Sequence, residues 1–169
     1  MQNTRIASDK NHVQSFASEP VVVTNNKVSI EYEIENFNSK SDSLYNGFSG
    51  SGFTETSSQV NKSIKIPINI IQSGMYAIDF RYANGNGPIN TENKCAIRTL
   101  QINDQFAGTI VFPQRGKNEW SNWDFSNSIM VYLEKGSQTI TLGLEDHNEN
   151  MNGEVNQAML DYLRISKIK

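Results

Sequence analysis

Two glutamates near the start of the chain have a spacing that suits a cation. Glu33 and Glu35 fall within Val28–Glu35, where apolar and polar residues alternate strictly. Such alternation predicts a half-buried strand, so both carboxylates should leave the same face, about 6.6 Å apart at the backbone. Carboxylates at this distance repel each other unless water solvates them or a hard cation such as calcium bridges them. The spacing alone leaves both possibilities open: a solvated acidic strand face, or part of a cation site.

A polar loop with a tryptophan suggests a second kind of chemistry. Trp120 stands among polar residues in Asn118–Asn122. A sugar presents an apolar face and several hydroxyl groups, so its site needs an aromatic plane and a few polar side chains. Trp120 could supply such a plane. Tyr45, in a glycine-rich stretch, is a second candidate aromatic, with an ordinary half-buried tyrosine as the equal alternative.

Two further residues, at the end of the predicted strand Met75–Tyr82 and just after it, could bind sugar hydroxyls. Asn84 comes just after this strand, and Arg81 is a candidate if it points to the loop end. Arg81 could equally form an ion pair on the strand face with Asp79. The spacing does not decide between these two roles.

The rest of the chain predicts many short strands and no helix longer than a turn. Runs of five to eight residues with β-type patterning are separated by turns rich in Asn, Gly and Ser. Pro67 interrupts one of them, Ser63–Ile70, and places it at an edge or a bulge. Strands at such regular spacing predict an all-β sandwich or barrel. We expect a jelly-roll β-sandwich of two antiparallel sheets.

Composition excludes several classes of protein. The chain has 169 residues and a net charge of −3, with its lysines and arginines scattered. It has therefore no electrostatic footprint for nucleic acid, and no run approaches the ~20 apolar residues of a membrane span. Its single cysteine, Cys95, excludes an internal disulfide and a multi-thiolate metal site. We expect no nucleic-acid partner and no membrane partner.

Several landmarks occur in an order that is typical of one group of proteins. They are Tyr32–Glu35, the glycine-rich Tyr45–Phe53, Gly74–Gly85, the stretch Val111–Leu142 with its Trp-x-x-Trp pair, and Leu160–Ile165. In this order they resemble the carbohydrate-binding modules of families 6 and 35, and family 35 more closely. The resemblance covers about residues 28 to 168. It implies a non-catalytic sugar-binding domain of a secreted polysaccharide-degrading enzyme, with a poly- or oligosaccharide as ligand.

The resemblance also implies a structural calcium ion. In related modules, positions that match Glu33, Glu35 and Asp161 bind calcium away from the sugar. Asp161 lies in the last predicted strand, which should pair with the first one in this fold. Calcium would then tie the two strands together, so that its binding energy stabilises the fold.

The same resemblance assigns roles to the two tryptophans and reveals one departure. Trp120 matches the sugar-stacking position, and Trp123 matches the position that packs inside. Where related modules have an asparagine that contacts the ligand, this chain has Met159. Asn156, three residues earlier, is our candidate replacement. The predicted ligand set is therefore Tyr45, Arg81, Asn84, Trp120 and Asn156.

Two other functions compete with sugar binding. One is a structural or interaction domain that kept the fold without the ligand, which Met159 makes credible. The other is a small glycoside hydrolase or lyase that uses paired carboxylates of the Glu31–Glu35 strand. We expect a linker or loosely docked arm over residues 1–20 and one domain over 21–169, with a catalytic domain in cis as a further option. Residues 1–10 lack the apolar core of a signal peptide, so the expected extracellular, periplasmic or cell-surface location follows from the resemblance alone.

Overall fold

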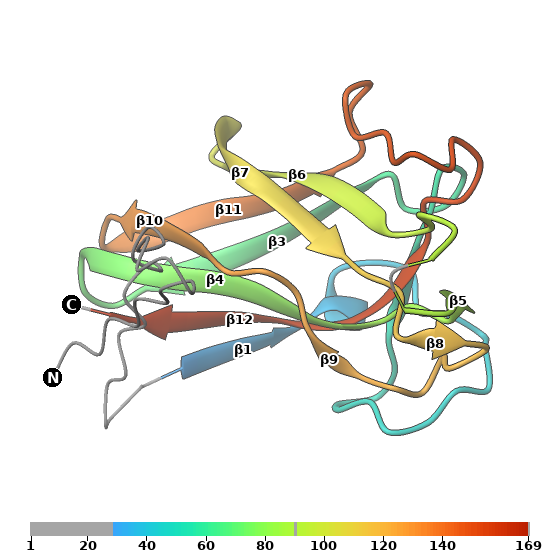
Figure 1. The fold of residues 1–169 in the computed structure, drawn as a ribbon. Coiled ribbons are helices and arrows are strands. Elements are labelled where there is room, and N and C mark those ends of the chain that lie inside the picture. The colour runs from blue at the N-terminus through green and yellow to red at the C-terminus, as the bar shows by residue number, and fades with distance from the viewer. Residues whose placement is uncertain (1–28, 90, 169) are drawn as a thin grey trace, which may run out of the picture.

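The computed structural model describes residues 29–89 and 91–168, and within them the chain is built of strands (Figure 1). The only helical element in these ranges is a single 3-10 turn, η1 (Ile34–Asn36). A helix long and apolar enough to cross a membrane is not found among the described residues. The predicted arm over residues 1–20 lies outside the described part of the chain.

Two antiparallel sheets make up the body of the domain. The first follows the order β1-β12-β4-β10, with β2 paired to β12 and β9 paired to β4. Its strands are β1 (Ser29–Glu33), β2 (Thr54–Thr56), β4 (Gly74–Ala83), β9 (Asp124–Phe125), β10 (Ile129–Leu133) and β12 (Ala158–Lys167). The second has the order β3-β11-β6-β7 and comprises β3 (Ser63–Ile70), β6 (Ala96–Ile102), β7 (Gln105–Phe112) and β11 (Gly136–Gly143). A small third sheet pairs β5 (Asn86–Gly87) with β8 (Gly116–Lys117).

This arrangement confirms the predicted all-β sandwich of two antiparallel sheets. Pro67 lies in β3, which is an edge strand of the second sheet, as its missing N–H requires. β1 and β12 pair from Ser29 opposite Ser166 to Glu33 opposite Tyr162. The first and last described strands are therefore neighbours, as the resemblance implies.

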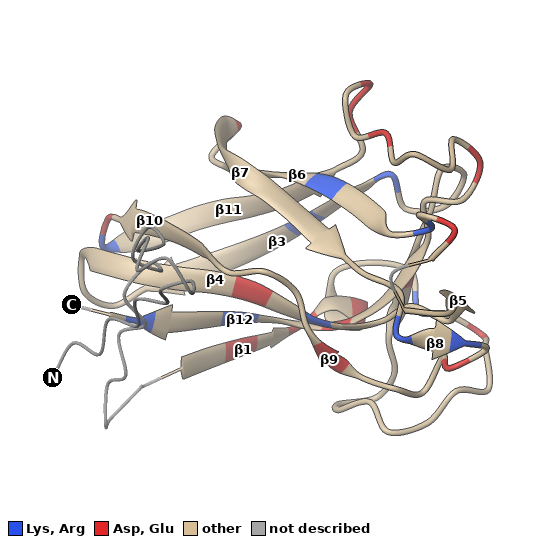
Figure 2. Cartoon of the chain, in the orientation of Figure 1, with Lys and Arg blue, Asp and Glu red and all other residues tan. Residues whose placement is uncertain are grey.

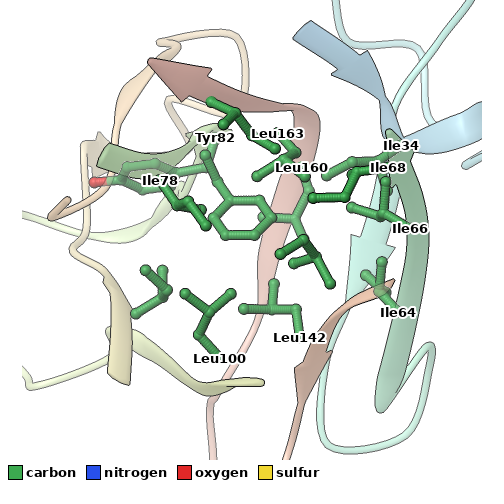
Figure 3. Packing of buried hydrophobic residues seen from close by; sticks show 14 of the residues in the cluster. Ile34, Ile64, Ile66, Ile68, Ile78, Tyr82, Leu100, Leu142, Leu160 and Leu163 are labelled. Atoms are coloured by element: carbon green, nitrogen blue, oxygen red, sulfur yellow. The ribbon is translucent and has the colours of Figure 1, made fainter. Parts of the chain in front are cut away.

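The core lies between the two sheets and is formed by inward-facing aliphatic and aromatic side chains. β3 shows the cause most clearly, because Ile64, Ile66, Ile68 and Ile70 are buried while the residues between them are exposed. Figure 3 shows Ile64, Ile66 and Ile68 in one cluster with Leu160 and Leu163 of β12 and Tyr82 of β4. Burial of each such side chain contributes about 1.5–3 kcal/mol.

Two irregularities in the first sheet matter for the candidate site. The predicted strand Val28–Glu35 is too long, because β1 ends at Glu33 and Glu35 stands on the η1 turn. In β12 the register with β4 shifts between Leu160 and Leu163, which marks a β-bulge around Asp161. A bulge changes the direction of the side chains at its position. Asp161 thereby reaches the same loop as Glu33 and Glu35.

A buried arginine fixes the connection between β11 and β12. Arg98 of β6 is fully buried and makes four hydrogen bonds, to Thr56 Oγ1, to the Ile97 carbonyl, and to Oδ1 and the carbonyl of Asn156. Burial lowers the pKa of Arg98 to about 10. All of these partners are neutral, so the guanidinium acts as a multiple donor that fastens the loop at Asn156 to the second sheet.

We expect Arg98→Ala to lower the free energy of unfolding by about 2–4 kcal/mol, because it leaves a cavity and several acceptors without donors. Chemical denaturation followed by tryptophan fluorescence measures this loss. Arg98→Met keeps most of the volume but none of the donors. If Arg98→Met were as stable as the unchanged protein, packing rather than hydrogen bonding would explain the role of this residue.

Candidate functional site

A second apolar cluster lies at the end of the sandwich where β4 runs into the loop at Gly85. Its buried members are Phe53, Ala83 and Met159, and its half-buried rings are Tyr45, Phe48, Trp120 and Trp123. The rings come from two loops, 45–53 and 118–123, that are far apart in the sequence. Gly47 and Gly50 allow the first loop to turn, with φ of 81° and 59°. We call this set of residues the loop-end aromatic cluster.

Trp120 and Tyr45 form the outer part of this cluster. Their rings are nearly parallel, with centroids 5.7 Å apart and an interplanar angle of 16°. Both side chains are half-buried, so each keeps part of its surface open to solvent. An aromatic pair of this kind can cover the apolar face of a pyranose ring. The structure brings together the two aromatic residues that the sequence analysis singled out for stacking.

Gly85 provides the seat on which Trp120 lies. A Cβ added at Gly85 would stand 2.8 Å from Cδ1, Cδ2 and Cε2 of Trp120, which shows that the indole lies flat on this backbone. The amide of Asn118 also donates to the Gly85 carbonyl over 2.8 Å and so fixes the start of the Trp120 loop. Only glycine permits this close approach.

We expect Gly85→Ala to move the Trp120 ring, because the methyl group takes the place of the indole, and so to weaken about tenfold the binding of any sugar that stacks on this ring. Isothermal titration with the bound glycan measures this loss, and near-ultraviolet circular dichroism reports the shift of the ring. Gly143→Ala is the matched control, since its added Cβ meets only Oε1 of Glu145, at 3.2 Å. Unchanged affinity in Gly85→Ala would show that the position of Trp120 is irrelevant.

Trp123 has an internal role. Its Nε1 donates to the carbonyl of Asn46 over 2.7 Å, and its ring lies 5.5 Å from that of Phe53. The Arg81 guanidinium lies 5.7 Å from the centre of the Trp123 ring. Trp123 therefore holds the 45–53 loop in place.

Three residues predicted as ligand contacts, Asn84, Asn156 and Arg81, have hydrogen-bond or ion-pair partners within the fold. Asn84 is fully buried: its amide donates to the carbonyls of Lys94 and Phe112, and its Oδ1 accepts from Asn86. All hydrogen-bonding groups of this side-chain amide have partners within the fold, so Asn84 stabilises the conformation of its loop.

Asn156 and Arg81 are also engaged away from the aromatic pair. Oδ1 of Asn156 accepts from the Ile97 amide and from Arg98, and its Nδ2 donates to the Asn148 carbonyl. Arg81 forms a salt bridge with Asp161, and its Nη2 donates to the Gly47 carbonyl over 3.0 Å. Neither residue enters the proposed sugar contacts. The sequence pattern could not predict these internal partners, because a polar residue that binds a ligand and one that stabilises a loop have the same residue type.

The polar groups around the aromatic pair come from positions outside the predicted ligand set. Asn46, Glu119 and Ser121 are exposed and adjoin Tyr45 or Trp120 along the chain. The amide of Asn46 donates to Ser121 Oγ over 3.1 Å, which joins the two aromatic loops. The only sequence signal for Asn46 is its place between Tyr45 and the turn at Gly47.

The three carboxylates predicted to bind calcium converge on one loop, Ser49–Gly52. Oγ of Ser49 lies 2.9 Å from Glu33 Oε1 and 3.1 Å from Asp161 Oδ1, and its amide donates to Asp161. The amides of Ser51 and Gly52 donate to Glu35 Oε1 over 2.9 and 3.1 Å. We call Glu33, Glu35 and Asp161 the carboxylate cluster. A 3-10 turn, a strand end and a bulge, rather than one regular strand, bring its members together.

Electrostatics in the carboxylate cluster leave negative charge to be balanced, and Figure 2 shows acidic residues (red) along β1, where the cluster begins. Burial raises the pKa of Glu33, and the charges of Asp161 and Glu35 raise it further against a hydrogen bond from Ser49. Burial also raises the pKa of Asp161, whereas Arg81 and Ser49 lower it. Arg81 is the cation paired with this cluster in the described residues, so one positive charge faces three carboxylates.

The donor set fits a hard cation, although the carboxylates do not surround a common point. Oε2 of Glu35 is buried without a hydrogen-bond partner, which is costly for a charged oxygen. Carboxylate and hydroxyl oxygens are the ligands that calcium prefers. Among the described residues, however, no group of three or more acidic, His or Cys side chains has the geometry of a metal site. Ser49 lies between the carboxylates instead.

One loop connects the two parts of the site. The 45–53 loop carries Tyr45 at its start, and its backbone amides at Ser49 and Ser51 bind the carboxylate cluster. A Cβ at Gly50 would stand 2.6 Å from Glu35 Oε1 and 2.9 Å from Glu33 Oε2, so this turn is pressed against both carboxylates. Order at the cluster therefore supports order at the aromatic pair.

Comparisons with known proteins define the class to which this fold belongs. No family model matches the chain. The family 35 carbohydrate-binding module from Clostridium thermocellum superposes on it with a TM-score of 0.59, at 21% identity, covering 81% of this chain and 96% of the module. The chain thus has the fold of a family 35 carbohydrate-binding module, which confirms the predicted resemblance.

Two curated relatives are longer enzymes. A cycloisomaltooligosaccharide glucanotransferase from Niallia circulans is 33% identical over 121 residues, which are 72% of this chain and 11% of the enzyme. Mannan endo-1,4-beta-mannosidase B from Piromyces sp is 30% identical over 117 residues, 67% of this chain and 18% of the enzyme. The chain therefore spans less than a fifth of the length of either relative.

Proposed function

We propose that this chain is a non-catalytic carbohydrate-binding module that recognises a glycan through its loop-end aromatic cluster. The observation that carries this proposal is the half-exposed pair of Trp120 and Tyr45, which the two loops hold on Gly85. Exposed polar groups of Asn46, Glu119 and Ser121 stand next to the pair for sugar hydroxyls. The family 35 fold and the two enzyme relatives support the same function.

We further propose that the module belongs to a secreted enzyme that acts on a polysaccharide and brings its catalytic domain to the substrate. The relatives act on different glycans by their names, a glucan-derived one and a mannan. Isomalto-oligosaccharides and manno-oligosaccharides are therefore the first ligands to test. An aromatic platform with few polar contacts predicts weak binding, with dissociation constants of about 10 µM to 1 mM.

Calcium is proposed as a structural ion at the carboxylate cluster. Glu33, Glu35 and Asp161 would hold it, with the unpaired Oε2 of Glu35 as one oxygen ligand. When bound, it would neutralise the three carboxylates and fasten the 45–53 loop to β1 and β12. Sugar affinity should then depend on calcium through the position of Tyr45.

A glycan array followed by isothermal titration tests the function, with calcium and with a chelator. We expect a defined set of glycans to bind without release of reducing sugar. An array without a hit, together with intact folding, would instead favour a structural or interaction domain. For that alternative the specific observation is Met159, which is 2% exposed and presents no polar group at a position where related modules have a ligand contact.

A hydrolytic function has weaker support. The carboxylates of Glu33 and Glu35 bind Ser49 and the amides of Ser51 and Gly52, so they face a loop of their own chain. A glycosidase needs its two carboxyl groups on opposite sides of a bound sugar. Release of reducing sugar from the glycan panel would reverse this conclusion.

A further inference from the structure

A groove opens at the opposite end of the sandwich, between the edge strands β7 and β10. Its volume is about 600 Å³, and half-buried Ile102, Ala107 and Val131 form its apolar part. Figure 1 shows the β6–β7 turn and the β10–β11 connection, which border it, at the end of the molecule away from β5 and β8. This groove is separate from the loop-end aromatic cluster.

Two exposed aromatic rings line this groove. Phe106 is 67% exposed and Tyr132 is 59% exposed. A single exposed ring on a protein surface needs no explanation, whereas two rings at one hollow mark a binding surface. Phe106 follows a tight turn in which Asn103 and Asp104 have φ of 50° and 64°, so the backbone fixes its direction.

The polar residues at the groove are neutral amides and a hydroxyl, with one charge of each sign. Asn103, Gln105, Ser137 and Gln138 line it together with Glu134 and Lys135. Oδ1 of Asn103 accepts from the Thr139 amide, which orients the side chain. Aromatic planes beside amides and hydroxyls suit a neutral polyol, whereas a charged ligand would require a set of like charges.

A second groove continues the first. Its volume is about 430 Å³, and it shares Asn103, Ser137 and Gln138 with its neighbour. Tyr32 and Pro67 line its other part, and the Tyr32 hydroxyl accepts from the Asn69 amide over 3.3 Å. The two hollows form a trough with aromatic side chains in both parts and amides where they meet. An elongated ligand fits this form better than a compact one.

We propose that this trough is a second glycan-binding site, which takes an extended neutral oligosaccharide with sugar rings on Phe106 and Tyr132. The proposal rests on the proposed function of the chain as a sugar-binding module. It adds a site at the far end of the sandwich, so that one domain can hold two glycan chains, or two parts of one chain.

The test compares two variants. One is a double variant of the trough that carries both Phe106→Ala and Tyr132→Ala, and the other is Trp120→Ala at the loop-end aromatic cluster. The probes are isomaltohexaose and mannohexaose, and their binding is measured by isothermal titration and by changes in amide chemical shifts. Met130→Ala is the matched control, because Met130 is 64% exposed on the same strand as Tyr132 and does not line the groove. Phe106, Tyr132 and the control residue Met130 are all exposed, so their substitution should leave folding unaffected.

We expect the Trp120→Ala variant still to bind the probe, with amide chemical-shift changes confined to residues of the trough. Adding the Phe106 and Tyr132 substitutions should weaken this remaining binding about tenfold or more. If Trp120→Ala alone abolishes all binding, the second site is wrong while the proposed function stands. If the unchanged protein binds neither these probes nor any array glycan, both proposals fail together. Self-association that disappears in the double variant would assign the trough to a protein contact and overturn the second site.

Discussion

Trp120→Ala will weaken glycan binding at the loop-end site about thirtyfold or more, because an aromatic anchor at the centre of a site contributes about 2 kcal/mol or more. The indole lies flat on Gly85 and beside Tyr45, so no neighbouring side chain can replace it. Titration with the glycan identified by the array measures the loss. Thermal unfolding shows whether the fold is intact.

Trp123→Phe is the matched control for this experiment. It removes the hydrogen bond to the Asn46 carbonyl but keeps a ring against Phe53. We expect a lower unfolding temperature with sugar affinity changed less than about threefold. If the Trp123 variant lost affinity and the Trp120 variant kept it, the roles of the two tryptophans would have to be exchanged.

Asp161→Asn will lower the free energy of unfolding by about 3 kcal/mol and, with calcium at the carboxylate cluster as proposed, will also remove the calcium dependence of stability. The substitution leaves Arg81 without its ion-pair partner in a place where the Asp161 side chain is fully buried. The expected loss is at the low end for a buried pair, since the Arg81 side chain is 23% exposed. Urea denaturation in calcium and in chelator measures both effects.

The calcium effect itself can be bounded. An ion that binds only the folded state adds about 2.7 kcal/mol when its concentration is a hundred times its dissociation constant. Asp79→Asn is the control, because Asp79 pairs with Arg164 over 2.8 Å in the same sheet without contact to the 49–52 loop. It should lose stability and keep the calcium shift. A full calcium shift in Asp161→Asn would exclude this residue as a ligand.

The architecture of this protein could be predicted from its sequence because burial imposes a strict period on strands. In Ser63–Ile70 the four isoleucines alternate with polar residues, and that pattern permits one orientation toward the core. The end of β1 could not be predicted in the same way. Ile34 continues the alternation although the backbone has already turned into η1, because its side chain is buried in either conformation.

The candidate site was predictable where residue type limits the role and unpredictable where contacts decide it. The rings of Trp120 and Tyr45 are in contact, as expected, because large aromatic side chains in neighbouring loops bury apolar surface against each other. Asn84 and Asn156 have amides that close loops within the fold, which depends on the path of segments distant in sequence. The close approach of the Trp120 ring to the Gly85 backbone joins segments distant in sequence, so no local pattern records it.

The pairing of the outermost strands has a consequence for how such a domain is carried by a longer polypeptide. Ser29 of β1 stands opposite Ser166 of β12, so the chain enters and leaves this body at neighbouring points. Ser166 pairs with Ala77 of β4, which lies eight residues, or about 26 Å along an extended chain, from the turn at Gly85 on which the indole lies. A longer polypeptide that joins this body through these two strands would carry Trp120 and Tyr45 at the end far from the junction.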